Sequence, residues 1–86
     1  PEPFNAWLLY PNPVVGNQFN IQLDEILNPV RVTVFDSKGA RVSEASLQIN
    51  WQNNPFEYDI SNLLPGLYYV RIQSGSRKAT FRVMKQ

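Results

Sequence analysis

The sequence GLYYVRIQSGSRKATFRV, at residues 66–83, consists of two alternating segments on either side of a short polar turn. In the first segment, one side of an extended chain holds Tyr68, Val70 and Ile72, and the other holds Leu67, Tyr69 and Arg71. In the second segment, the two sides hold Ala79, Phe81 and Val83, and Lys78, Thr80 and Arg82. A period of two around a Gly-containing turn predicts a β-hairpin with one buried face.

The register of this hairpin depends on which two residues form its loop. If the loop is residues 74–75, Arg71 lies directly opposite Lys78. If the loop is Gly75-Ser76, Arg71 lies opposite Thr80 instead. Because like charges directly opposite each other destabilise a sheet, we predict the Gly75-Ser76 loop, of type II′.

The rest of the chain repeats the same pattern. Clear alternation occurs at Phe19–Leu23, Val30–Val34 and Phe56–Ile60, and weaker strand signals occur at Trp7–Tyr10 and Val42–Ile49. No window shows a helical stripe. Short strands separated by turns every 8–12 residues or so predict an all-β fold, an immunoglobulin-like antiparallel β-sandwich of about seven short strands. A small closed barrel is the alternative.

Composition limits the function classes. The 86 residues fit one domain, and a net charge of +1 gives no electrostatic case for nucleic acid binding. The absence of Cys and His excludes Ser-His-Asp and Cys-His catalysis and most zinc sites. No apolar run is long enough to span a bilayer, and no signal peptide is visible. We read the chain as part of a longer protein, with residues 1–6 a linker remnant and residues 7–86 the domain.

Two turn motifs punctuate the strands. Tyr10-Pro11-Asn12-Pro13 is, on its own, a rigid turn that leaves an aromatic-anchored strand. Asp36-Ser37-Lys38-Gly39 suits a type I turn that ends with Gly39 in a left-handed, bulge-forming conformation.

The ordered combination of these segments resembles the C-terminal sorting domain of proteins exported by the type IX secretion system. The resemblance extends from about Leu9 to Gln86, and no single block is specific. Its blocks are a Tyr-Pro-Asn-Pro opening, a strand and turn of the form Val-x-Val-x-Asp-x-x-Gly-x-x-Val, a Leu-x-x-Gly-x-Tyr-x-Val-x-Ile block and a lysine near the end. The matching residues are Tyr10, Pro11, Asn12, Pro13, Val32, Val34, Asp36, Gly39, Val42, Leu63, Gly66, Tyr68, Val70, Ile72 and Lys85.

The resemblance implies a non-enzymatic, cofactor-free domain that an export machine recognises by its folded shape. It implies an outer-membrane translocon and a sortase-like peptidase as partners, with transit through the periplasm to the outer-membrane surface or the medium. It assigns translocon recognition to Gly66, Tyr68, Val70, Arg71, Lys78, Arg82 and Lys85. It assigns a structural role to Tyr10, Pro11, Asn12, Pro13, Asp36, Gly39 and Leu63. We expect Tyr68 and Val70 in the core, a glycine-specific backbone at Gly66, and exposed positions for Arg71, Lys78, Arg82 and Lys85.

Other readings of the same residues stay open. Trp7 and Trp51 either cap the core or stack on sugar rings, as in a carbohydrate-binding or adhesive immunoglobulin-like module. Glu57 and Asp59 share an outward face, but two carboxylates alone make a weak calcium site, so we expect no metal. Exposed edge strands leave room for a strand-exchanged homodimer.

Overall fold

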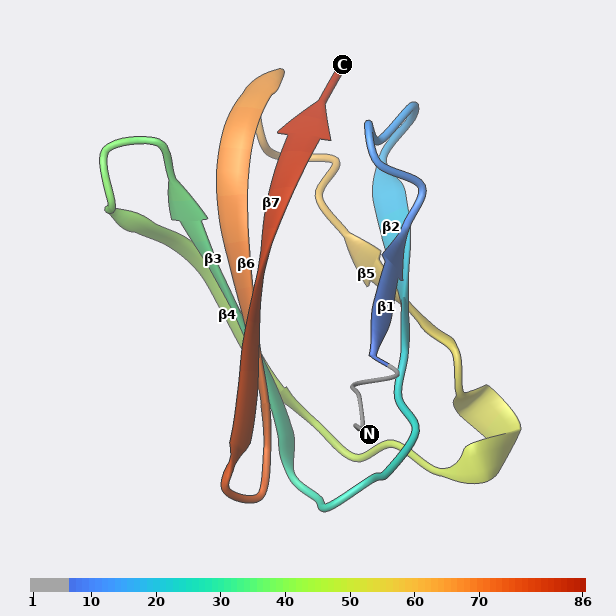
Figure 1. The fold of residues 1–86 in the computed structure, drawn as a ribbon. Coiled ribbons are helices and arrows are strands. Elements are labelled where there is room, and N and C mark those ends of the chain that lie inside the picture. The colour runs from blue at the N-terminus through green and yellow to red at the C-terminus, as the bar shows by residue number, and fades with distance from the viewer. Residues whose placement is uncertain (1–6) are drawn as a thin grey trace, which may run out of the picture.

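The computed structural model describes residues 7–86 of the chain, and the expected linker at residues 1–6 lies outside this range. The strands are β1 (Leu8–Tyr10), β2 (Gln18–Gln22), β3 (Val30–Asp36), β4 (Arg41–Leu47), β5 (Phe56–Asp59), β6 (Gly66–Ser74) and β7 (Arg77–Lys85). They form two antiparallel sheets, one of order β1-β2-β5 and one of order β4-β3-β6-β7, which face each other (Figure 1). The β-sandwich prediction is therefore confirmed, and the closed barrel is not formed.

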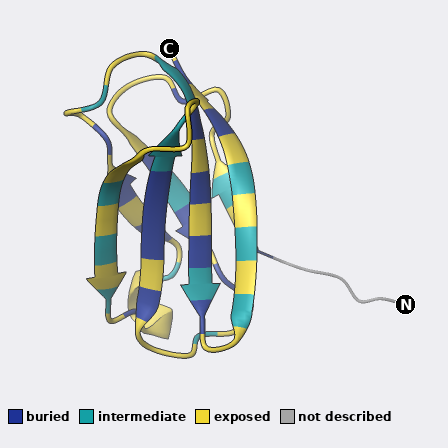
Figure 2. Ribbon diagram, turned by 90° about the vertical axis from the view of Figure 1, so that its left-hand side faces the viewer, coloured by how far each residue is buried: buried dark blue, intermediate teal, exposed yellow. Residues whose placement is uncertain are grey.

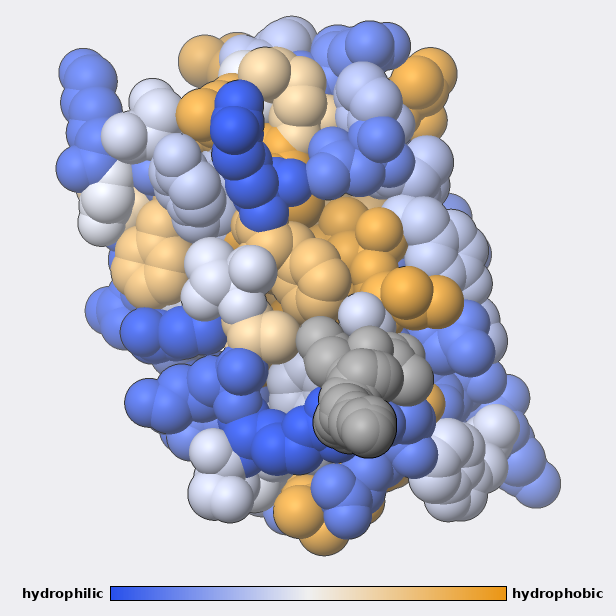
Figure 3. Space-filling model, in the orientation of Figure 1, coloured by the Kyte–Doolittle hydropathy of each residue, from blue (hydrophilic) through white to orange (hydrophobic). Residues whose placement is uncertain are grey.

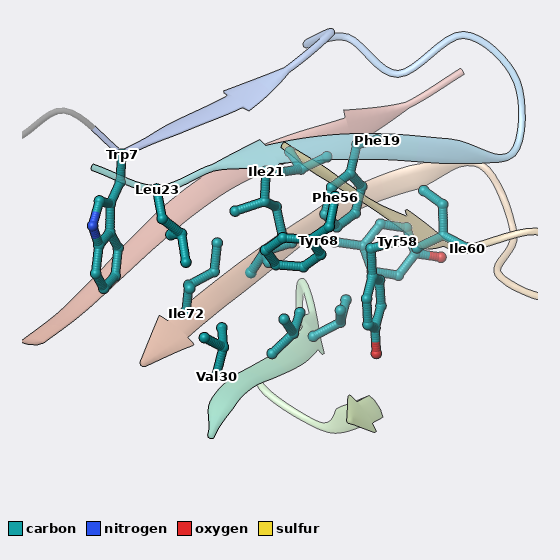
Figure 4. Close-up of a cluster of buried hydrophobic side chains, with 14 of the residues drawn as sticks. Trp7, Phe19, Ile21, Leu23, Val30, Phe56, Tyr58, Ile60, Tyr68 and Ile72 are labelled. Atoms are coloured by element: carbon teal, nitrogen blue, oxygen red, sulfur yellow. The ribbon is translucent and has the colours of Figure 1, made fainter. Parts of the chain in front are cut away.

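The core lies between the two sheets because each strand turns its apolar positions inward. Phe19 and Ile21 of β2 and Ile72 of β6 are fully buried (Figure 4). Val70 of β6 is fully buried as well. The rings of Phe19 and Tyr58 stack with their centres 5.6 Å apart. Burial of each such aliphatic or aromatic side chain contributes about 1.5–3 kcal/mol, which is the main term available to a domain without disulfides.

Alternation is visible along the four-stranded sheet, where buried and exposed residues follow one another (Figure 2). The exception is β3, in which Val30, Val32, Thr33 and Val34 are all buried. This strand lies between β4 and β6, so neighbouring side chains cover it from both sides.

The loops that cross between the sheets are held by asparagine side chains. Asn28 bonds both backbone groups of Ile49, through Nδ2 at 2.9 Å and Oδ1 at 2.9 Å. Asn54 does the same for Leu23, at 2.8 Å and 3.0 Å. Between them, Trp51–Asn53 forms a single 3₁₀ turn capped by Asn50, which the alternation pattern did not predict. These bonds satisfy backbone groups that leave the ladders, as buried loops require.

Candidate functional site: the C-terminal hairpin and the segment that covers its edge

The hairpin β6–β7 has the register predicted from charge. Arg71 pairs with Thr80, and Ser74 pairs with Arg77, so the loop is Gly75-Ser76. Gly75 has a φ of +61° and Ser76 does not have a positive φ, as a type II′ turn requires. A Cβ on Gly75 would lie 2.6 Å from Cδ1 of Leu27, so packing as well as backbone geometry selects glycine here.

The Tyr-Pro-Asn-Pro segment covers the outer edge of β7. The Asn12 side chain donates to the carbonyl of Arg82 at 2.7 Å and accepts from the amide of Met84 at 3.2 Å. One residue after the motif, the amide of Val14 donates to the carbonyl of Met84 at 2.7 Å, and the amide of Gln86 donates to the carbonyl of Val14 at 3.0 Å. A short parallel bridge results, and the sequence motif near residue 10 is thereby joined to the last strand.

Lys85 is buried, with 7% of its surface exposed, and its predicted exposure is wrong. It lies on the same side of β7 as Val83, so its stem enters the sandwich. Its Nζ donates to the carbonyls of Ile60 at 2.9 Å and Leu63 at 2.5 Å. A buried ammonium must be hydrogen-bonded, and these carbonyls, in the turn after β5, supply its acceptors. The structural role of Leu63, just before β6, is therefore to supply a carbonyl acceptor to Lys85.

Hydrogen bonds from Ser61 favour the charged form of Asp59. The backbone amide of Ser61 donates to Oδ1 of Asp59 at 2.8 Å and lowers the pKa of the Asp59 carboxyl below its usual range. The Ser61 hydroxyl and the charge of Lys85 lower that pKa further. Lys85 of β7 thus interacts both with the carbonyls of the turn after β5 and with the charge of Asp59 at the end of β5.

Gly66 and Tyr68 shape the start of β6. Gly66 has a φ of +154°, a conformation that side-chain-bearing residues rarely adopt, and its space is open rather than tight. Tyr68 is buried, and its hydroxyl donates to the carbonyl of Leu64 at 2.5 Å. A tyrosine near the start of a strand that bonds back to the preceding loop resembles the tyrosine corner of immunoglobulin-type sandwiches. Tyr68 and the fully buried Val70 are core residues, as predicted.

Asp36 and Gly39 form the predicted turn between β3 and β4. The amide of Gly39 donates to the carbonyl of Asp36 at 3.0 Å, and Gly39 has a φ of +89°. Oδ1 of Asp36 accepts from the amides of Lys38 and Ala40, each at 2.9 Å. The Asp36 carboxylate therefore bonds within its own turn, which fits its structural assignment.

The residues assigned to recognition therefore separate into two groups. Gly66, Tyr68, Val70 and Lys85 build the fold. Arg71, Lys78 and Arg82 are exposed together on the outer side of the four-stranded sheet. Charge alone pointed to Lys85 as an exposed residue, although its even spacing from Phe81 and Val83 placed it on the inner face.

The two tryptophans have different environments. Trp7 is buried, with 3% exposed, and the guanidinium of Arg77 lies 4.5 Å from its ring centre, so Trp7 caps the core. Trp51 is 64% exposed on its 3₁₀ turn and does not cap the core. Glu57 and Asp59 point outward, but no group of three or more metal-ligating side chains occurs among residues 7–86. Within the same range, none of the helical segments is long and apolar enough to cross a membrane.

The geometry defines a β-sandwich domain whose opening motif and last strand form one unit. The chain belongs to the family described as the secretion system C-terminal sorting domain, of the type IX system, because the family model matches residues 8–86. No curated protein matches the chain. Among solved structures it is similar to dimeric latent PorU from Porphyromonas gingivalis, with a TM-score of 0.60 and 18% identity over 92% of this chain. It spans 9% of that PorU chain, and at this identity the likeness supports the fold alone.

Proposed function

We propose that this domain is the export signal that directs a cargo protein across the outer membrane through the type IX translocon. The proposal includes passage of the cargo protein through the periplasm. A sortase-like peptidase then cleaves the domain from the cargo, which is attached at the cell surface or secreted. In this reading residues 7–86 are the sorting domain, they carry no catalytic activity, and the cargo supplies whatever activity the whole protein has.

The observation that carries the proposal is the convergence of the family's separated blocks on one structural unit. Asn12 of the opening motif bonds to β7, and Lys85 of the last block bonds to the carbonyl of Leu63. Gly66 and Tyr68 lie at the start of β6, the strand that follows Leu63 and pairs with β7. Residues of this kind preserve a shape, and they leave the exposed side chains of the hairpin for contact with the machine. We therefore propose that recognition uses Arg71, Lys78 and Arg82, with Gly66, Tyr68, Val70 and Lys85 acting through the fold.

The test is a fusion of this chain to the C-terminus of a fluorescent protein with a signal peptide, expressed in a bacterium with the type IX machinery. We expect fluorescence at the surface or in the medium that disappears when the translocon is deleted. Retention in the periplasm in both strains, with the domain shown to be folded, would contradict the proposal.

Truncation gives a second measurement, and the structure shows how to interpret it. Deletion of residues 83–86 removes the buried Val83 and the ammonium of Lys85, so the truncated domain loses core packing as well as sequence. We expect the truncated fusion to stay in the periplasm. Export at the normal level would contradict a role for the last strand.

A glycan-binding module is the second candidate, and Trp51 favours it. Trp51 is 64% exposed on a turn fixed by Asn50 and Asn53, whose side-chain oxygens each accept a hydrogen bond from the other residue's backbone amide. A fixed exposed aromatic ring is a common platform for sugars. Titration of soluble glycans with fluorescence detection, using Trp51→Ala as the matched variant, tests this candidate; no spectral change in the wild-type chain would reject it.

A further inference from the structure

The outer surface of the four-stranded sheet carries most of the cations of the domain. Figure 2 looks onto this surface. By register, its exposed cations are Arg31, Arg41, Arg71, Lys78 and Arg82. Glu44 is the acidic residue of the same surface, so the described positions of this face have a clear positive excess.

The positive charge is concentrated on the β6–β7 half of this surface. Glu44 lies on β4, where it pairs with Arg41 at 3.2 Å and approaches Arg31 at 4.0 Å. By contrast, among the ion pairs of residues 7–86, none involves Arg71, Lys78 or Arg82. The three cations are therefore not neutralised by the domain itself.

The register makes these three cations close neighbours. Arg71 pairs with Thr80, so Lys78 and Arg82 are both diagonal to it, a relation that separates residues by about 7–8 Å. Three like charges at this spacing repel one another in the free domain. A partner that supplies negative charge removes that repulsion when it binds.

Aromatic and apolar side chains lie among the cations. The guanidinium of Arg71 lies 5.2 Å from the ring centre of Phe35, which orients it. Tyr69, beside Arg82, is 36% exposed, and Met84 is 40% exposed. Arg, Tyr, Phe and Met are the residues enriched in protein–protein interfaces, and Tyr and Arg frequently dominate their binding energy.

The other outer face has the opposite character. The three-stranded sheet presents amides from β2, together with the carboxylates of Glu57 and Asp59 on β5. None of its strands β1, β2 and β5 contains a lysine or arginine. The domain is thus electrically polar across its thickness, which orients it in the field of a charged partner before contact.

We infer that the basic face, defined as Arg71, Lys78 and Arg82 with Phe35 and Tyr69, binds an acidic surface of a protein component of the export translocon. This inference rests on the proposed function and adds the chemistry of the partner. A broad sheet with half-exposed rings between cations fits the centre of a protein interface. Insertion into a lipid surface needs an apolar face or tip that projects into the acyl boundary, whereas Phe35, Tyr69 and Met84 on this face are at most partly exposed and lie between cations.

The decisive variant is Lys78→Glu/Arg82→Glu in the fluorescent fusion. It places two carboxylates diagonal to Arg71, so it relieves repulsion within the domain, and its melting temperature should be equal to or above that of the wild type. A carboxylate facing an acidic partner costs binding free energy, and we expect export to fall at least about tenfold, with folded fusion in the periplasm. A loss of export can then not be assigned to misfolding.

The matched control changes the net charge by the same amount away from the basic face. Lys38→Glu/Gln22→Glu/Gln52→Glu alters exposed positions on the β3–β4 turn, the end of β2 and the 3₁₀ turn. We expect export of this control at the wild-type level. If the control falls as far as the double reversal, export responds to net charge, and the inference is overturned.

Two further outcomes separate the inference from the proposed function. A wild-type fusion that is not exported contradicts the proposed function itself. Translocon-dependent export of the wild type, with the double reversal exported within about twofold of it, overturns the basic-face inference alone. If in addition the wild-type chain, and not the double reversal, sediments with phosphatidylglycerol vesicles, the face serves an anionic lipid instead.

Discussion

Lys85→Met tests whether the buried ammonium stabilises the fold. Methionine keeps an unbranched apolar stem and removes the charge, so the carbonyls of Ile60 and Leu63 lose their shared donor. The wild-type bonds come from a charged donor, and each contributes about 1.5–3 kcal/mol. The substitution also removes the cost of burying the ammonium, which amounts to several kcal/mol in a fully desolvated site. We expect a net loss of about 2 kcal/mol in the free energy of unfolding.

The measurement is urea unfolding followed by circular dichroism and by tryptophan fluorescence, to which the buried Trp7 contributes. With a slope near 1 kcal/mol/M for a chain of this size, the midpoint should fall by about 1.5–2 M. Lys38→Met is the control because Lys38 is exposed on the β3–β4 turn, and its midpoint should stay within about 0.5 M. Equal midpoints for the two variants would refute the structural role of Lys85.

Three further predictions address the covered edge of β7, the tyrosine corner at Tyr68 and the dependence of stability on acid pH. Asn12→Ala should cost about 1–2 kcal/mol and accelerate amide exchange at the end of the last strand, because both of its bonds to that strand disappear; Asn17→Ala, an exposed control, should change little in the same exchange and urea experiments. Tyr68→Phe should cost about 1 kcal/mol in thermal unfolding, whereas Tyr69→Phe at the exposed neighbouring position should cost nearly nothing, and equal losses would reject the corner. The lowered pKa of Asp59 means that the carboxylate stabilises the fold above its unfolded pKa and that this contribution is lost as the pH falls through the folded value. Asp59→Asn should therefore flatten the acid side of the pH–stability curve below pH ~4, and an unchanged curve would count against this assignment.

Alternation along the chain predicted most of the fold. The hairpin register followed from a single charge argument, because a shift in the loop would place Arg71 opposite Lys78 instead of Thr80. The left-handed conformation of Gly39 followed from turn chemistry. Both are local features, and local sequence contains the information that determines them.

The candidate site was harder to predict because its contacts are distant in sequence. Asn12 bonds to Arg82 and Met84, which are separated from it by 70 and 72 positions in the sequence. No local pattern indicates that an amide in a turn will act as a strand partner. The burial of Lys85 did have a signal, since its spacing from Val83 placed it on the inner face. The charge of a lysine favours an exposed position, against this signal, and the acceptors that satisfy the Lys85 ammonium lie in a turn that alternation does not describe.

The apolar seam between β1 and β7 also follows from long-range geometry. Figure 3 shows apolar surface over these strands, whose half-buried apolar residues include Leu9, Ala79 and Phe81. Residues 12–14 cover only the C-terminal end of β7, where they bond to Arg82, Met84 and the following Gln86. The N-terminal part of β7 keeps an open edge, and the strand-exchanged homodimer remains a prediction for this edge.

The bonds between residues 12–14 and residues 82–86 set a time order on synthesis. The partners of the opening motif are the last residues of the domain to leave the ribosome, so the edge is completed only after every preceding residue has been translated. A polypeptide that stops before β7 keeps Asn12 without its acceptor and leaves β6 as an open edge. Under the proposed function, a translocon that recognises the closed sandwich would thereby reject unfinished translation products without any separate proofreading step.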